Sequence, residues 1–275
     1  ETLSMTLPIS DHDISCFRQQ GAICLRGMFD REMLSLIETG IEKTQRSPTP
    51  YARVQSKPHD PGYFFTDYYM WRKHAEFARL MVEGPGAEIA ARCTGSEEIR
   101  FFYDGLFVKE PGTERRSDWH QDQPYYNVDG DQICVIWIPV DGIEHGAALK
   151  LVKGSHRWGR WFQPVFFASE RVLHGAEDRF EPMPDIDGNP DEYEILTWAM
   201  EPGDCLVFHP LMIHGATGNP RNDRRRRAIS TTWLGDDTVY GERADEVEPK
   251  IEGYSFRPGD RLNVESVFPK VWPRI

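Results

Sequence analysis

The sequence predicts an α+β protein whose core is a double-stranded β-helix, the jelly roll that cupins share. Two observations lead to this fold class. The first third of the chain carries apolar residues at helical intervals, and from Ile99 onward short apolar and aromatic strands alternate with turn residues, as in jelly rolls. Because 275 residues suit one large β domain, we predict a single domain, with a helical region over about 1–98, a jelly-roll core over about 99–235 and a C-terminal extension over 236–275.

The N-terminal third is predicted to be mainly helical. Ser10 begins a polar cap that precedes the first helix, and Gly21 can end that helix in left-handed geometry. The polar, Pro-containing segment 45–62 is predicted to be a loop that covers the mouth of an active site. The predicted elements, in order, are a helix over 14–20, a buried strand over 22–25, a helix beginning at 30–37, and helical segments over 68–71 and 74–93 that the Gly-Pro-Gly at 84–86 divides.

The jelly-roll core is predicted from five apolar runs, over 99–108, 132–140, 147–152, 205–209 and 228–233. The interruption from Trp158 to Trp198 is too long for a simple hairpin and is rich in Pro, Asp and Gly near its middle. We therefore expect it to form a loop over the mouth of the barrel.

The overall charge limits the classes of partner. With 44 acidic and 32 basic residues the net charge is -12, which argues against nucleic acid or an anionic membrane surface as the main partner and favours a small molecule. The basic run 221–227 is short and isolated. The five cysteines are scattered without Cys-x-x-Cys spacing, as expected of free thiols, and there is neither an apolar run of about 20 residues nor a leader-like N-terminus. We predict a cytoplasmic protein and leave its oligomeric state open.

The segment His120-Gln121-Asp122 indicates half of a metal site, because a histidine and an aspartate two residues apart project from one face of a strand or extended loop. An apolar, strand-like run that ends in His214 offers a third ligand, and His209 is its rival. Two imidazoles and one carboxylate form the facial triad that holds ferrous iron and leaves positions open for a co-substrate and oxygen.

The order of motifs around these residues resembles the phytanoyl-CoA dioxygenase family of Fe(II)- and 2-oxoglutarate-dependent oxygenases. The matching stretches are 108–112, 120–122, 135–139, 148–156, 202–204 and the region of His214 with its downstream arginines. The resemblance implies Fe(II), 2-oxoglutarate and O2 as cofactors and co-substrates, with His120, Asp122 and His214 as ligands. His214 is preferred to His209 because Gly215 and the arginines match the family. Related halogenases have a small residue at the carboxylate position, so Asp122 points to hydroxylation or desaturation.

The resemblance also implies an arginine for the distal carboxylate of 2-oxoglutarate, about eleven residues after the second histidine and next to an Ala-Ile-Ser-like strand. Arg226 fits the strand register but lies 226 − 214 = 12 residues on, whereas Arg225 keeps the spacing and loses the register. Alternation places Arg226 and Ser230 on one face, opposite Arg225. We predict Arg226, with Arg225 as the alternative.

Further site residues are predicted from their positions in the matching stretches. Family members often carry a serine two residues after the second histidine, where this chain has Ala216, so that contact is absent or is made by Thr217. The predicted 2-oxoglutarate pocket also includes Trp137, Tyr103, Phe107 and Lys109. The predicted substrate contacts are Tyr126, Trp158, Arg160 and Trp161.

The sequence therefore predicts a 2-oxoglutarate-dependent dioxygenase that hydroxylates a small polar metabolite, such as an organophosphonate or an amino-acid-like compound, and releases succinate and CO2. An acyl-CoA would require phosphate-binding cations that are not evident outside the arginine run. The alternatives are an oxygenase that tailors a natural product or an acyl-CoA, a non-catalytic cupin-type binding protein, and a non-redox metal hydrolase, which would leave Arg226 without a role.

Overall fold

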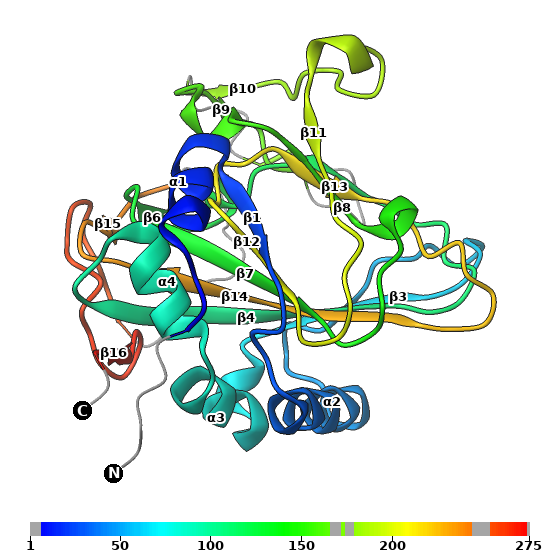
Figure 1. The fold of residues 1–275 in the computed structure, drawn as a ribbon, viewed down its shortest axis with the longest axis horizontal. Helices are drawn as coiled ribbons and strands as arrows, with labels where there is room; N and C mark the ends of the chain where they lie inside the picture. The colour runs from blue at the N-terminus through cyan, green and yellow to red at the C-terminus, as the bar shows by residue number, and fades with distance from the viewer. Residues whose placement is uncertain (1–6, 166–171, 174–178, 244–253, 274–275) are drawn as a thin grey trace.

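The computed structural model describes residues 7–165, 172–173, 179–243 and 254–273. Two β-sheets face each other at its centre, and four helices cover the outer face of the larger one (Figure 1). The antiparallel sheets confirm the predicted jelly-roll class.

The large sheet has eight strands. In spatial order they are β1 (Ala22–Leu25), β12 (Cys205–Phe208), β7 (Ile133–Pro139), β14 (Arg226–Leu234), β4 (Ile99–Lys109), β3 (Phe64–Tyr68) and β2 (Arg53–Val54), with β16 (Lys270–Trp272) also paired to β4. The small sheet has four strands, β11 (Ile195–Leu196), β8 (Leu149–Val152), β13 (His214–Ala216) and β5 (Ser117–His120). Two short pairs join β9 (Trp161–Phe162) to β10 (Phe180–Glu181), and β6 (Val128–Asp129) to β15 (Val239–Tyr240).

The helices are α1 (Asp11–Gln20), α2 (Arg31–Arg46), α3 (Ala75–Glu83) and α4 (Gly86–Thr94). Short 3-10 turns occur at Met70–Arg72, Gln123–Tyr125, His145–Ala147, Ser155–Arg157 and Pro190–Glu192. The side chain of Ser10 caps α1 by accepting a hydrogen bond from the backbone N–H of Asp13, and Gly21 ends the helix with φ of 87°. Both predictions for this helix are confirmed.

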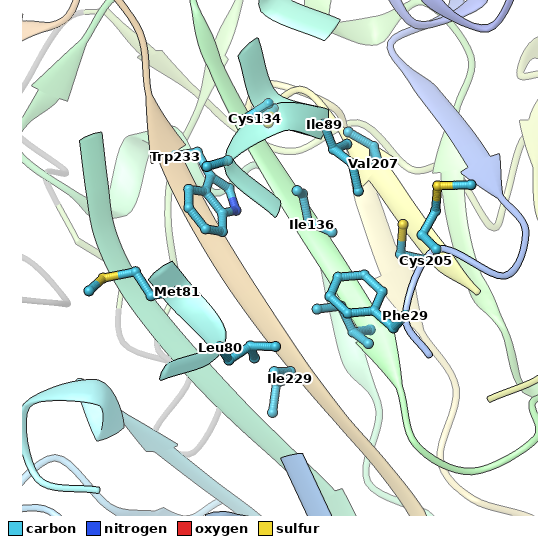
Figure 2. Packing of buried hydrophobic residues seen from close by; sticks show 14 of the residues in the cluster. Phe29, Leu80, Met81, Ile89, Cys134, Ile136, Cys205, Val207, Ile229 and Trp233 are labelled. Carbon is cyan, nitrogen blue, oxygen red and sulfur yellow. The ribbon is translucent and has the colours of Figure 1, made fainter. Parts of the chain in front are cut away.

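Alternation along the large sheet separates two cores. On the outer face, Ile136 of β7, Val207 of β12 and Ile229 of β14 pack against Leu80 of α3 and Ile89 of α4 (Figure 2). The opposite side, here called the inner face, meets the small sheet in a second cluster. That cluster includes Trp137, Leu206, Phe208 and Ala228 from the large sheet, with Leu149, Leu151 and Ala216 from the small one. Strands β7 and β12 of the large sheet are continuous apolar runs because both faces of this sheet are covered.

Three details of the prediction were wrong. Tyr68 ends strand β3 and does not begin a helix, because residues 64–68 pair with β4. The segment 45–62 is a loop only in part, since α2 continues to Arg46 and β2 lies within the segment. The run before His214 is a turn, and strand β13 begins at that histidine. Of the long segment 158–198, the described residues form β9, β10 and β11, while 166–171 and 174–178 lie outside the described residues.

Candidate metal centre

Three predicted ligands meet between β5 and β13. The ligand atoms of His120, Asp122 and His214 all lie within 4.8 Å of one another. Oδ1 of Asp122 is 3.4 Å from Nε2 of His120 and 3.6 Å from Nε2 of His214. These separations suit three ligands that share one ion at the usual distances of about 2 Å. In the described part of the chain no other group of three such side chains converges in this way.

The two histidines come together because their strands pair. His120 at the end of β5 is the register partner of His214 at the start of β13, and their ring centroids are 4.1 Å apart. Nδ1 of His120 donates a hydrogen bond to the carbonyl oxygen of Asp118 at 2.7 Å, and Nδ1 of His214 donates to that of Met212 at 3.0 Å. A ring that donates through Nδ1 keeps a lone pair on Nε2, so both rings present the atom that can bind a metal.

Asp122 reaches the site by a different route from the one predicted. The strand ends at His120, and Asp122 lies in helical geometry at the start of a 3-10 turn. Its backbone N–H donates to the carbonyl oxygen of Pro210 at 2.8 Å, which ties this turn to the one before His214. The prediction that strand alternation would align the pair was therefore wrong, and the chain reversal brings the carboxylate to the histidines.

The electrostatic environment suits a divalent cation. Burial and the nearby ring of His120 lower the pKa of His214 to about 4, so this imidazole is neutral near pH 7. Burial opposes ionisation of Asp122, but the adjacent rings of His214 and His120 hold the pKa of that carboxyl below its ordinary value. The site thus offers two imidazole nitrogens and one anionic oxygen, the donor set of the ferrous facial triad.

His209 does not share this cluster. Its Nε2 donates to the carbonyl oxygen of Asp131, and its Nδ1 accepts the backbone N–H of Leu211. Both ring nitrogens are therefore used, and the ring lies beside His156, 5.4 Å away between centroids. The structure brings His214, and not its rival, to the other two ligands.

Two buried cations lie together on the inner face of the large sheet. Arg226 of β14 and Lys109 of β4 are register partners, and Arg226 is only 8% exposed. Lys109 Nζ and Arg226 Nη2 both donate to the carbonyl oxygen of Thr217, at 2.9 and 3.0 Å. Burial and the charge of Arg226 lower the pKa of Lys109 well below its ordinary value, and burial lowers that of Arg226 to about 10. Within the described residues neither cation has a carboxylate partner.

This pair provides what the distal carboxylate of 2-oxoglutarate requires. Two cations buried in a site of low dielectric destabilise the folded protein unless an anion binds beside them. Both cations donate to Thr217, which directly follows β13. They therefore lie at the end of the strand that begins with the metal ligand His214. Lys109 and Arg226 therefore fit a carboxylate of the kind that 2-oxoglutarate carries.

The neighbouring arginines face elsewhere. Arg225 is 41% exposed in its side chain and pairs with Glu110 through both carboxylate oxygens. Arg221 and Arg224 both bind Glu144 at the surface. Alternation along β14 thus separates Arg226 from Arg225, as the strand register predicts.

The predicted pocket residues occupy the inner face around these groups. Trp137 of β7 is the partner of Ser230 on β14, and Phe107 of β4 is the partner of Ala228. Tyr103 lies on the same face of β4 and packs edge-on against the buried Tyr126, and the negative charge of Asp122 adds to the burial that raises the pKa of both phenols. The hydroxyl of Thr217 donates to carbonyl oxygens of Gly146 and Gly218, so this residue offers its carbonyl and not its hydroxyl to the cations.

The predicted substrate residues in the long segment have partners of their own. Trp158 packs edge-on against Phe162, Arg160 is exposed and pairs with Glu181, and Trp161 lies beside Phe180. Their role in substrate binding stays a prediction.

Gln121, which the sequence reasoning passed over, connects this segment to the metal motif. Its Nε2 donates to the carbonyl oxygens of Arg160 and Leu211, and its Oε1 accepts the N–H of Phe162. The position of Gln121 between two predicted metal ligands is the sequence signal that indicates this role.

Comparison with known proteins agrees with this geometry. The profile of the family described as Phytanoyl-CoA dioxygenase (PhyH) matches residues 17–228. A probable phytanoyl-CoA dioxygenase of Caenorhabditis elegans is 30% identical over 44% of this chain and 37% of its own length, and the peroxisomal phytanoyl-CoA dioxygenase of Rattus norvegicus is 24% identical over 84% and 64%. The chain thus spans less than two thirds of these relatives.

Solved structures share the fold. The 2-oxoglutarate-dependent carbocyclase SnoK from nogalamycin biosynthesis has a TM-score of 0.76 at 21% identity, covering 96% of this chain and 97% of its own. EctD from S. alaskensis, solved with 2-oxoglutarate and 5-hydroxyectoine, has a TM-score of 0.68 at 18% identity, covering 92% and 86%. In the described residues, no helix combines the length and apolar character needed to cross a membrane. The cytoplasmic location stays a prediction.

Proposed function

Since the chain belongs to the phytanoyl-CoA dioxygenase family of Fe(II)- and 2-oxoglutarate-dependent oxygenases, we propose that it hydroxylates a small polar metabolite and releases succinate and CO2. The observation that carries this proposal is the combination of the triad with the buried cations. His120, Asp122 and His214 supply a ferrous donor set beside the small sheet, and Lys109 and Arg226 supply a carboxylate site on the inner face of the large sheet, which the small sheet meets. A metal hydrolase or a simple binding protein of this fold has no need of both.

Each residue has a separate task in this proposal. His120, Asp122 and His214 would hold iron with one side open, and the bound iron and 2-oxoglutarate together supply the activation of O2 for attack on a C–H bond. Arg226 binds the distal carboxylate with its planar fork, and Lys109 adds a second charge. Trp137, Tyr103 and Phe107 shield the space between them from water, which strengthens these charge interactions.

The size of the substrate is inferred from the charges near the site. A CoA ester carries several phosphates, which require unpaired cations. Arg221, Arg224 and Arg225 are already paired with carboxylates. EctD, a protein of this fold, was solved with 5-hydroxyectoine, which supports a small substrate. A natural-product intermediate is the second candidate, since SnoK and SnoN from nogalamycin biosynthesis share the fold.

The proposal is tested by measuring succinate formation from 2-oxoglutarate with Fe(II), with and without a panel of organophosphonates, amino acids and natural-product intermediates. We expect His214→Ala to abolish both iron binding and succinate formation. His209→Gln is the matched control, because it alters a buried histidine of the same segment that has other partners, and we expect it to retain both. Succinate formation that survives in His214→Ala, or that proceeds equally with Zn²⁺, would contradict the proposal.

A further inference from the structure

A polar side chain from the segment 45–62 reaches the inner face of the large sheet. Strand β2 pairs Val54 with Phe65, and the backbone N–H of Gln55 continues this ladder by donating to the carbonyl oxygen of Phe64 at 2.8 Å. Phe64 is the partner of Lys109, which is the partner of Arg226. Gln55 therefore stands at the end of a row that crosses four strands and contains both buried cations.

The side chain of Gln55 is fixed but incompletely satisfied. It is only 7% exposed, although Arg53 and Val54 before it are exposed. Its Nε2 donates to Oγ1 of Thr66 at 3.0 Å, whereas its Oε1 is buried and has no hydrogen-bond partner. A buried acceptor that is left unpaired destabilises the folded protein, so this oxygen is expected to meet a partner when the protein works.

Contacts on both sides hold the chain that carries Gln55. The hydroxyl of Ser56 accepts the backbone N–H of Phe64, which fixes the chain just after Gln55. Behind the sheet, Thr49 donates its N–H and hydroxyl to the buried carboxylate of Asp67. The backbone around Gln55 is thus held by these contacts, and the amide itself is oriented by its hydrogen bond to Thr66.

The amide shares its face with the residues around the metal centre. Thr66 is the register partner of Phe107, and the ring of Tyr68 on the same strand lies 6.5 Å from that of Phe107 and 6.3 Å from that of Tyr103. The ring of Tyr103 lies 6.0 Å from that of Tyr126, which follows the metal ligand Asp122 on the turn that carries it. Gln55 consequently borders the space that a substrate would fill.

The chemistry of the unpaired Oε1 atom of Gln55 determines which groups can bind to it. An amide oxygen can only accept a hydrogen bond, and 2-oxoglutarate at neutral pH has two carboxylates and a ketone but no donor. We propose that Gln55 is a substrate-recognition residue, whose Oε1 accepts a hydrogen bond from a hydroxyl or amino group of the primary substrate. This inference rests on the proposed function and adds to it that the substrate carries such a donor away from the carbon that is oxidised.

Four variants test the assignment. Gln55→Leu removes the acceptor, and Gln55→Glu keeps one. Thr66→Val removes the internal partner, and the double variant Gln55→Leu/Thr66→Val removes both partners with little change of shape. Gln19→Leu, an exposed glutamine of α1, is the control. The probes are small diols, amino alcohols and aminophosphonates, each compared with its deoxy or deamino counterpart in a succinate assay.

We expect the wild type to prefer the donor-bearing compound of a pair by about tenfold or more in kcat/KM, as a site that hydrogen-bonds a hydroxyl does. Gln55→Leu should lose this preference and Gln55→Glu should keep it, while the Kd for 2-oxoglutarate, followed by the Fe(II)–2-oxoglutarate absorption band, stays within about twofold in both. The assignment would be overturned if Gln55→Leu kept the preference. It would also be overturned if only Gln55→Glu lost the preference, because the amide would then present its NH2 group to the substrate.

Thermal unfolding provides a readout that needs no substrate. If Gln55 is kept for recognition, the double variant should unfold at the wild-type temperature or above, because replacing both polar partners removes an unsatisfied acceptor. A clear loss of Tm would show a structural role and overturn the inference. Absence of any 2-oxoglutarate turnover in the wild type would instead overturn the proposed function, so the two failures are distinguishable.

Discussion

Arg226→Ala and Arg225→Ala form a matched pair of adjacent substitutions with opposite expected results. Arg226 is buried beside Lys109, so a carboxylate bound there would receive hydrogen bonds from a charged fork. Each net hydrogen bond to a charged group contributes about 1.5–3 kcal/mol, so losing two costs at least about 3 kcal/mol. At about 1.4 kcal/mol for each factor of ten, the Kd for 2-oxoglutarate should rise by roughly 100-fold or more.

Arg225→Ala should have little effect on the co-substrate. Its pair with Glu110 is partly exposed to solvent, and surface pairs contribute only about 0–1 kcal/mol to stability. The assay is titration of 2-oxoglutarate into the Fe(II)-loaded variants, followed by absorption and by succinate formation. Because the guanidinium of Arg226 also donates to the carbonyl oxygens of Ala147 and Gly218, Arg226→Lys is included as a folded variant that keeps the charge and loses the fork.

A large defect in Arg225→Ala with a near-normal Arg226→Ala would refute this reasoning. It would mean that spacing along the chain, and not strand register, selects the arginine. Equal defects in both would indicate that the start of β14 is disturbed, and iron affinity would then identify the cause.

Two other predictions concern buried carboxyls. Asp122→Ala should lower iron affinity and abolish hydroxylation while opening a position for a halide; unchanged hydroxylation would mean that the carboxylate ligand is elsewhere. Burial raises the pKa of Asp104 to about 8, although the backbone N–H of Trp71 donates to it, so the folded state holds a proton that the unfolded state releases near pH 4. Stability should therefore fall as pH rises from about 4 to 8, and Asp104→Asn should flatten this slope in denaturant unfolding curves; an unchanged slope would assign the proton to another group.

The central strands of the large sheet can be predicted from local patterns, whereas the metal ligands are predicted from the order of motifs that resembles the family. Residues 133–139 are apolar throughout, and a run buried on both faces can be recognised without knowing its neighbours. The sequence does not predict strand β3, because Phe64–Tyr68 is a short run between a Pro-Gly pair and the helix-like segment 68–71, to which its last residue is assigned. Its pairing with β4, which no local pattern reveals, makes it a strand.

The features of the candidate site also differ in how far the sequence predicts them. The family-like Ala-Ile-Ser register of its strand favours Arg226, alternation separates it from Arg225, and the structure places Arg226 on the inner face. The row from Gln55 to Arg226 depends on three successive strand registers, which a single sequence does not specify. The turn that carries Asp122 depends on a hydrogen bond to Pro210, far along the chain.

The pairing of β5 with β13 affects how the protein can lose and regain its metal. His120 and His214 are held as register partners, each ring is oriented by a backbone carbonyl, and the turn of Asp122 is fixed by Pro210. None of these constraints uses the ion, so the conformational entropy of assembling the ligands is lost when the chain folds and not when iron binds. A small zinc domain, by contrast, folds only around its metal. We therefore expect that iron lost from this site can be replaced without refolding, so that the working life of the protein exceeds that of any single ion it carries.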